Sequence, residues 1–312
     1  MKSITLAKSP ASFALLDDWH AKFEARLPFA TTTRRLETTS GFTDVLVTGD
    51  DGTADGSTPV VVLHGAMAGA PFALGELAEL PGRRRFYAVN IPGQSTRAEP
   101  VRLDFRTDEY GRWLEEIFDR LDIAEAIVVA ISWGASVALA MARYAPDRIA
   151  GLVLVVPASI VTGPVLPAVF GLALPLMRYR LFPTAVNRDR ALARLVTTPE
   201  DRLWTPYLGD ALRHWKIDFT APPLAKPDDL KEFERPVAVV AADRDLSFPG
   251  RKVLDRSAAL FPNLIGTHLL KNSFHCPSTR PDDRTELASR IEGFLDKMSA
   301  GRHGREFKSA RP

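Results

Sequence analysis

The chain has 312 residues, of which 46% are hydrophobic, so it can bury one sizeable core, and a single α/β domain with an insertion is expected. Its 40 lysines and arginines nearly balance 38 aspartates and glutamates, so the chain as a whole has no strong field to gather nucleic acid or an anionic membrane. Its single cysteine, Cys276, excludes an internal disulfide and a multi-cysteine metal site.

The amino-terminal segment does not resemble a secretory signal, because it lacks a continuous apolar stretch and a small-residue cleavage site. Residues 10–27 predict an amphipathic helix instead, within a helical extension that covers residues 1–30. Together with the single cysteine, this pattern predicts a cytoplasmic protein.

The segment 31–156 predicts the first part of an α/β core. Short apolar stretches rich in valine and isoleucine alternate with amphipathic segments, a rhythm typical of parallel strands joined by helices. An antiparallel hairpin of residues 31–38 and 42–48 is expected to open the sheet. The parallel strands are expected at 60–63, 86–91, 126–131 and 149–156, and the helices at 72–80, 107–121 and 133–144.

The rhythm fails over residues 157–226, which predict a mostly helical cap inserted after the sixth strand. The stretch 149–177 is uncharged and long enough to span a bilayer, but four prolines interrupt it. We therefore expect a buried strand that continues into an apolar lid, with no stable membrane insertion. The apolar side chains at the start of the cap are expected either to contact an apolar part of the substrate or to pack the cap onto the core. The cap arginines are interpreted as a solvated face.

Strand-like stretches resume at 236–242 and 268–271, and a helix is expected at 285–298. Residues 227–298 thus predict the second part of the core and complete a mostly parallel sheet of about eight strands flanked by helices. The segment 299–312 is polar and basic, so it is expected to be a disordered tail.

A serine stands where the strand 126–131 gives way to a helix, in the pentapeptide Ala130-Ile-Ser132-Trp-Gly134. A sharp strand-to-helix turn needs small residues two positions before and after the serine, and Ala130 and Gly134 meet that need. A plain helix N-cap would account for the pentapeptide equally well. The motif resembles the nucleophile elbow of the α/β-hydrolase family, in which a glycine usually stands at the position of Ala130.

The sequence His64-Gly65-Ala66-Met67 follows the strand 60–63 and resembles the oxyanion loop of the same family. By that resemblance, the backbone N–H groups of Ala66 and Trp133 form the oxyanion hole, and His64 holds the loop. The turn that begins at Asn90 is similar in part, since the family usually has an aspartate there.

A serine nucleophile needs a general base, and the base needs a partner that fixes its tautomer. Of the six histidines, only His275 falls in a loop between the last strand and the final helix, where the family carries its catalytic histidine. Asp245 is the expected acid because it stands four residues before a proline, as in the family, and Asp243 is the fallback. An acid after the sixth strand is disfavoured, because no carboxylate occurs between Asp147 and Asp189.

The resemblance thus implies an α/β-hydrolase fold with Ser132 as nucleophile, His275 as general base and Asp245 as orienting acid. The expected reaction is hydrolysis of a carboxylic ester, or of a lactone or thioester, of an apolar small molecule through an acyl-enzyme. Two alternatives stay open: an acyltransferase with the same triad, and a non-catalytic ligand-binding protein. No metal, nucleotide or flavin motif is evident, so no cofactor is expected. The expected partner is a small-molecule ester, with no nucleic acid.

Overall fold

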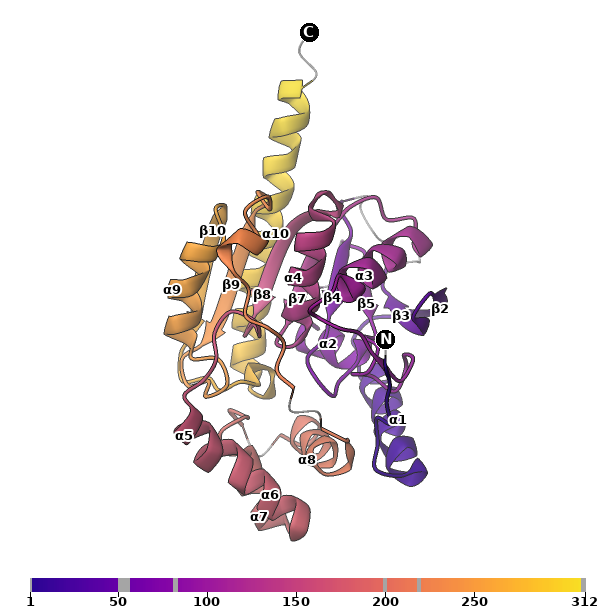
Figure 1. The fold of residues 1–312 in the computed structure, drawn as a ribbon, viewed down its shortest axis with the longest axis vertical. Helices are drawn as coiled ribbons and strands as arrows, with labels where there is room; N and C mark the ends of the chain where they lie inside the picture. Colours follow the sequence, from indigo (N-terminus) through magenta and orange to yellow (C-terminus); the bar gives the residue numbers. More distant parts are fainter. Residues whose placement is uncertain (1, 50–56, 81–83, 199–200, 218–219, 310–312) are drawn as a thin grey trace.

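The structure is a computed structural model that describes residues 2–49, 57–80, 84–198, 201–217 and 220–309 (Figure 1). Within these ranges, an eight-stranded sheet has the order β10-β9-β8-β7-β4-β5-β3-β2. The two strands at one edge, β2 and β3, run antiparallel, and the others from β5 to β10 are parallel. The strands are β2 (Thr32–Thr38), β3 (Gly41–Val47), β4 (Val60–Leu63), β5 (Phe86–Val89), β7 (Ala126–Ile131), β8 (Ile149–Val155), β9 (Val237–Ala242) and β10 (Leu264–Leu270).

Helices cover both faces of the sheet, and the alternation of side chains along each strand assigns them to the two faces. In β4, Val61 and Leu63 join the core with α3 (Glu109–Arg120), α4 (Gly134–Tyr144) and α9 (Gly250–Leu260). Val60 and Val62 join the other core with α2 (Ala70–Glu76) and α10 (Pro281–Ser309). This is why the central strands are continuously apolar in sequence.

The N-terminal helix α1 (Pro10–Glu24) starts at Ser9, whose Oγ accepts a hydrogen bond from the Ser12 N–H at 3.1 Å. Its Phe23 packs in an aromatic cluster with Phe72 of α2 and Trp204 of α8 (Trp204–His214). The helix therefore ties the core to the segment 157–226. A short ribbon of β1 (Lys2–Ser3) and β6 (Val101–Arg102) lies outside the main sheet.

The segment predicted as a cap is helical, as Figure 1 shows at the end of the molecule opposite the projecting end of α10. It contains α5 (Val165–Ala168), the π-helical turn η2 (Val169–Ala173), α6 (Leu174–Leu181), α7 (Ala185–Leu192) and α8; the 3-10 turns η1 (Pro146–Arg148), η3 (Pro227–Asp229) and η4 (Pro277–Thr279) lie in the core. No helix in the described ranges is both long and apolar enough to cross a bilayer. The predicted limits of the core and cap segments stay a prediction.

Three expectations about local structure need correction. First, β10 begins at Leu264 rather than at His268, because the whole stretch pairs with β9. Second, α10 extends to Ser309, so the backbone is helical over most of the segment expected to be disordered, while 310–312 lie outside the described residues. Third, most apolar side chains at the start of the cap neither pack onto the core nor line a cavity: Val165 and Phe170 are exposed, whereas Ile160 is buried.

Candidate active site

Ser132 lies in the turn between β7 and α4 with a φ of 49°, a left-handed conformation that residues with a β-carbon rarely adopt. Its N–H donates to the Val155 carbonyl at 2.8 Å, and its carbonyl accepts from the N–H groups of Ala135 and Ala158 at 3.0 Å. These bonds to α4 and to the end of β8 hold the strained turn in place.

The positions two residues before and two residues after Ser132 differ in the space available for a β-carbon. A β-carbon on Gly134 would stand 2.6 Å from the Leu63 carbonyl oxygen and 2.8 Å from that of His64. Ala130 has such a carbon and is fully buried in β7 without disturbing the sheet. The turn thus requires glycine after the serine and tolerates alanine before it.

The structure brings together the three side chains predicted as a triad. Ser132 Oγ lies 2.9 Å from Nε2 of His275, and Nδ1 of His275 lies 2.7 Å from Oδ2 of Asp245. The other carboxylate oxygen of Asp245 accepts the N–H groups of Ser247 and Phe248 at 2.7 and 3.0 Å. Because the Asp245 side chain is fully buried and held by these amides, it fixes the orientation of the imidazole.

Opposing effects act on the His275 imidazole. Burial disfavours its charged form, but the Asp245 carboxylate favours that form through its charge and its hydrogen bond, and Glu76 adds to this effect only where it is ionised. The balance of these effects raises the pKa of His275 above its ordinary value. Burial itself raises the pKa of Glu76 to about 8.

Asp243, the fallback acid, points elsewhere. It is exposed, and its Oδ1 accepts the N–H of Ser273 at 3.1 Å, which stabilises the loop before His275. The neighbouring Cys276 is held by a backbone hydrogen bond to Leu195. Burial raises the pKa of the Cys276 thiol, which disfavours the nucleophilic thiolate.

Ala66 and Trp133 line the same cavity as Ser132, on the two loops predicted to supply the oxyanion hole. The Trp133 amide stands at the N-terminus of α4, where the helix dipole favours negative charge. His64 is buried beneath the loop: its Nδ1 lies 2.7 Å from the Gly65 carbonyl, and its Nε2 accepts the N–H of Ile91 at 2.9 Å. Burial lowers the pKa of His64 to about 4, so it stays neutral.

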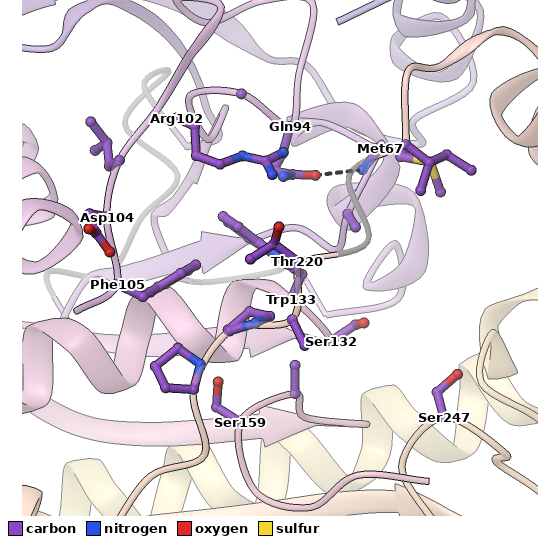
Figure 2. Close-up of a pocket in the computed structure, with 18 of the residues that line it drawn as sticks. Met67, Gln94, Arg102, Asp104, Phe105, Ser132, Trp133, Ser159, Thr220 and Ser247 are labelled. Carbon is purple, nitrogen blue, oxygen red and sulfur yellow. Dashed lines mark hydrogen bonds between the residues drawn. The ribbon is translucent and has the colours of Figure 1, made fainter. Parts of the chain in front are cut away.

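Two residues that sequence reasoning missed anchor Met67, which follows Ala66 and has a φ of 55°. The Met67 N–H donates to Oε1 of Gln94 at 3.2 Å, as Figure 2 shows. The Met67 carbonyl accepts from the hydroxyl of Tyr207, in α8. A core residue and a cap residue thus both hold the loop that contains Ala66 and Met67. Of these two residues, only Gln94 lies in a turn that the sequence pattern marked.

A cavity of about 790 Å³ opens above Ser132 (Figure 2). Four large rings contribute to its wall: Trp133 packs edge-on against Phe105, and Phe248 and Trp215 line the cavity as well. Charged side chains line it too: Lys2, Arg102, Asp104, Arg106 and Lys216. The cavity is therefore bounded by the core and by the segment 157–226. Within the described residues, no group of three or more histidine, cysteine, aspartate or glutamate side chains is placed to hold a metal ion.

Residues 58–194 match the family model described as alpha/beta hydrolase fold. Two solved structures from Bacillus subtilis superpose on nearly the whole chain. Naproxen esterase (carboxylesterase NP) gives a TM-score of 0.75 at 17% identity, covering 94% of this chain and 100% of that one. Carboxylesterase CesB (YbfK) gives 0.75 at 18%, covering 91% and 98%. The chain has the α/β-hydrolase fold.

Curated relatives align with this α/β-hydrolase-fold chain over shorter stretches. A carboxylesterase of Bacillus subtilis strain 168, nap, described as uncharacterized, is 26% identical over 124 residues, which are 40% of either chain. The dihydrolipoyllysine-residue acetyltransferase component of the acetoin cleaving system of Pseudomonas putida is 32% identical over 106 residues, 34% of this chain and 28% of its own. The aligned stretches thus span less than half of these relatives. The fold predicted from sequence is confirmed.

Proposed function

We propose that the protein is a serine hydrolase that cleaves carboxylic esters of apolar small molecules. The observation that carries the proposal is the unbroken chain of hydrogen bonds from Asp245 through His275 to Ser132, which ends at the cavity. A buried carboxylate, an oriented imidazole and a strained serine are the three parts that acyl transfer needs. The names of the two Bacillus carboxylesterases support the ester as substrate.

The proposed reaction has two halves. His275 Nε2 takes the proton of Ser132 as Oγ attacks the ester carbonyl carbon, and the N–H groups of Ala66 and Trp133 stabilise the oxyanion. The tetrahedral intermediate collapses, and His275 returns the proton to the leaving alcohol. Water, deprotonated by His275, then attacks the acyl-enzyme. As the bond from Ser132 Oγ to the acyl carbon breaks, His275 returns the proton to Oγ, and the acid is released. Asp245 stays ionised and stabilises the imidazolium in both halves.

The cavity supports an apolar substrate class, because rings and aliphatic side chains form most of its wall. Lactones and thioesters present the same electrophilic carbonyl, so an ester panel should include them. The single cysteine, Cys276, fits a reducing compartment, and we propose that the protein acts in the cytoplasm.

A fluorophosphonate probe, which phosphonylates an activated serine, tests the proposal. The native protein should be labelled, and Ser132→Ala should abolish labelling. Ser247→Ala is the matched control, because Ser247 lines the same cavity but its hydroxyl makes no hydrogen bond to a histidine within the described part of the chain, so labelling should persist. A folded native protein that stays unlabelled would contradict the proposal.

An acyltransferase is the second candidate, favoured by the acetyltransferase name of the Pseudomonas relative. Both activities share the acyl-enzyme and differ in the acceptor. Product analysis with added alcohols, amines and thiols separates them: free acid as the main product at all acceptor concentrations supports the hydrolase.

A further inference from the structure

The outward face of the cap carries an apolar surface. Among the described residues, eleven large hydrophobic side chains are exposed, and nine of them lie between Val165 and Val186. We call these nine the cap stripe: Val165, Leu166, Val169, Phe170, Leu174, Met177, Leu181, Phe182 and Val186. Isolated exposed hydrophobic residues are common on soluble proteins, but a gathered set marks a binding surface.

The spacing of the first seven of these residues, from Val165 to Leu181, places them on one side of a continuous helix, while Phe182 follows that helix and Val186 lies in α7. The backbone stays helical from Val165 to Leu181 through α5, η2 and α6. Leu166, Phe170 and Leu174 are four residues apart, and Met177 and Leu181 extend the same face at spacings of three and four. Leu166, Phe170 and Leu181 are 68%, 67% and 66% exposed, so nothing in the described chain covers them.

At α6 the opposite side of the same helix is also apolar, and there it is covered. Tyr179 of α6 is buried against Leu192, Val196 and Leu212, which form a small core inside the cap. A helix at the surface of a soluble protein normally presents polar residues to water, and a helix that is apolar on both sides is typically covered on both. The cap stripe therefore has the character of a face that meets an apolar environment.

Positive charge accompanies the cap stripe. From residue 157 to 198 the sequence has five arginines and one aspartate. Arg180 is held by the carbonyls of Leu212 and Trp215, and Arg188 pairs with Asp189. The other arginines of the segment are exposed: Arg178, whose Nε donates to Oδ1 of Asn187 at 2.9 Å, Arg190 and Arg194.

These exposed arginines lie beside the cap stripe. Arg178 follows Leu174 by one helical turn and precedes Leu181 by another, and Arg190 follows Val186 by one turn of α7. The Arg194 stem approaches Gly171 of η2, since a β-carbon built there would lie 3.8 Å from Arg194 Cγ. Guanidinium groups at the border of an apolar surface match a lipid interface, where phosphates lie above acyl chains.

We propose that the cap stripe docks the protein onto an anionic phospholipid bilayer as a peripheral contact. A second copy of the chain would also cover apolar side chains, but a twofold contact through the cap stripe would bring the arginines of two caps together, and the one aspartate among them, Asp189, already pairs with Arg188. In an anionic bilayer, the acyl chains would cover the apolar side chains of the cap stripe, and the phosphates would pair with the arginines beside it. The helix would lie in the interface to a depth of roughly 5–10 Å rather than span the membrane.

The location of the cap stripe fits this role. Val161 and Thr162, just before α5, line the cavity above Ser132. A β-carbon on Gly171 would approach Leu246 within 2.8 Å, so the helix rests on the loop that carries Asp245. Docking would therefore bring the cavity close to the bilayer. This inference goes beyond the proposed ester hydrolysis and does not depend on it.

Co-sedimentation with vesicles tests the proposal, using phosphatidylcholine alone and phosphatidylcholine mixed with phosphatidylserine. The native protein should bind the mixed vesicles more tightly, and added salt should weaken the binding. The double variant Leu166→Ser/Phe170→Ser should lose at least about tenfold in affinity, since burial of each such side chain stabilises by well over one factor of ten. Arg190→Gln should lose about fivefold.

Phe13→Ser is the matched control, because Phe13 of α1 is an exposed hydrophobic residue outside the cap stripe, and its binding should equal that of the native protein. Circular dichroism and thermal unfolding should show each variant folded, since the changed side chains are exposed. Equal binding of the native protein and the double variant would overturn the proposal. So would a native dimer in gel filtration that the double variant disrupts, with no vesicle binding, because the second copy would then be the occupant.

Discussion

Gly134 packs against the end of β4 so tightly that a β-carbon on it would stand 2.6 Å from the carbonyl oxygen of Leu63. The nearest atoms, the carbonyl oxygens of Leu63 and His64, belong to the backbone. They cannot move without shifting the end of β4 and the loop that follows it. Gly134→Ala should therefore destabilise the protein by about 1–3 kcal/mol and lower ester turnover, because overpacking displaces the turn that holds Ser132. Urea unfolding and kcat measure the two effects.

Gly293→Ala is the matched control for this prediction. Gly293 lies in α10, and a β-carbon added to it would have nothing within 4 Å, so alanine should be neutral or stabilising by up to about 1 kcal/mol. Equal stability of the two variants would show that the turn can relax around a β-carbon.

Asp245→Asn should lower kcat by about ten-thousandfold while the fold persists, because an amide at this position favours the wrong tautomer of His275. Asp243→Asn should have a small effect, since Asp243 is exposed and contacts the Ser273 amide, not the imidazole. Steady-state kinetics on one ester substrate compares the two variants. A larger loss for Asp243→Asn would mean that the acid has been assigned to the wrong carboxylate.

The sequence predicted the central strands well, because parallel strands buried on both faces leave continuous apolar stretches such as 60–63 and 126–131. It also predicted which serine, histidine and aspartate meet, since each follows a strand and parallel strands end at one edge of the sheet. The partners of the oxyanion loop were not predictable. Tyr207 contacts Met67 across 140 residues of chain, and no local pattern signals such a contact.

The exposure of the cap stripe could not be predicted from the sequence, for a different reason. A helix that is apolar on both sides has the composition of a core helix, so the sequence around Leu166 and Phe170 suggested packing or substrate contact. Only the three-dimensional arrangement distinguishes the side that meets Leu192 from the side that meets solvent.

The pH dependence of kcat/KM should report on His275. Only the neutral imidazole can accept the Ser132 proton, so the rate should rise with pH through the pKa of His275 and then level off. Burial favours the neutral form, but the charge and hydrogen bond of the Asp245 carboxylate outweigh it, so the midpoint should lie above the ordinary histidine value of 6.5. In Asp245→Asn the midpoint of the residual rate should move to lower pH.

Glu76→Gln is the control for the pH profile. Burial raises the pKa of Glu76 to about 8, so this carboxyl is mostly uncharged near neutrality. The variant should keep its midpoint within error of the native one below that pH. A midpoint in the native protein below 6.5 would contradict the balance of charges inferred at the site.

Asn90 is fully buried, and both the nitrogen and the oxygen of its side-chain amide make hydrogen bonds. Its Nδ2 donates to the Asp44 carbonyl at 2.6 Å, and its Oδ1 accepts from the Ala70 N–H at 3.0 Å and from the Ser95 hydroxyl at 2.8 Å. An aspartate, the residue usual in the family, has no donor for that carbonyl when it is ionised. Asn90→Asp should therefore destabilise the protein by roughly 1–3 kcal/mol, and more while the new carboxyl is charged.

Lowering the pH should reduce this destabilisation, because protonation of the new carboxyl restores a donor for the Asp44 carbonyl. Asn263→Asp is the matched control: Nδ2 of Asn263 donates to the Glu234 carbonyl at 3.0 Å, but in an exposed setting where water replaces the lost donor. Urea unfolding at neutral and acidic pH compares the two variants. If both lose the same free energy of unfolding, burial of the Asn90 amide is not what selects asparagine at this turn.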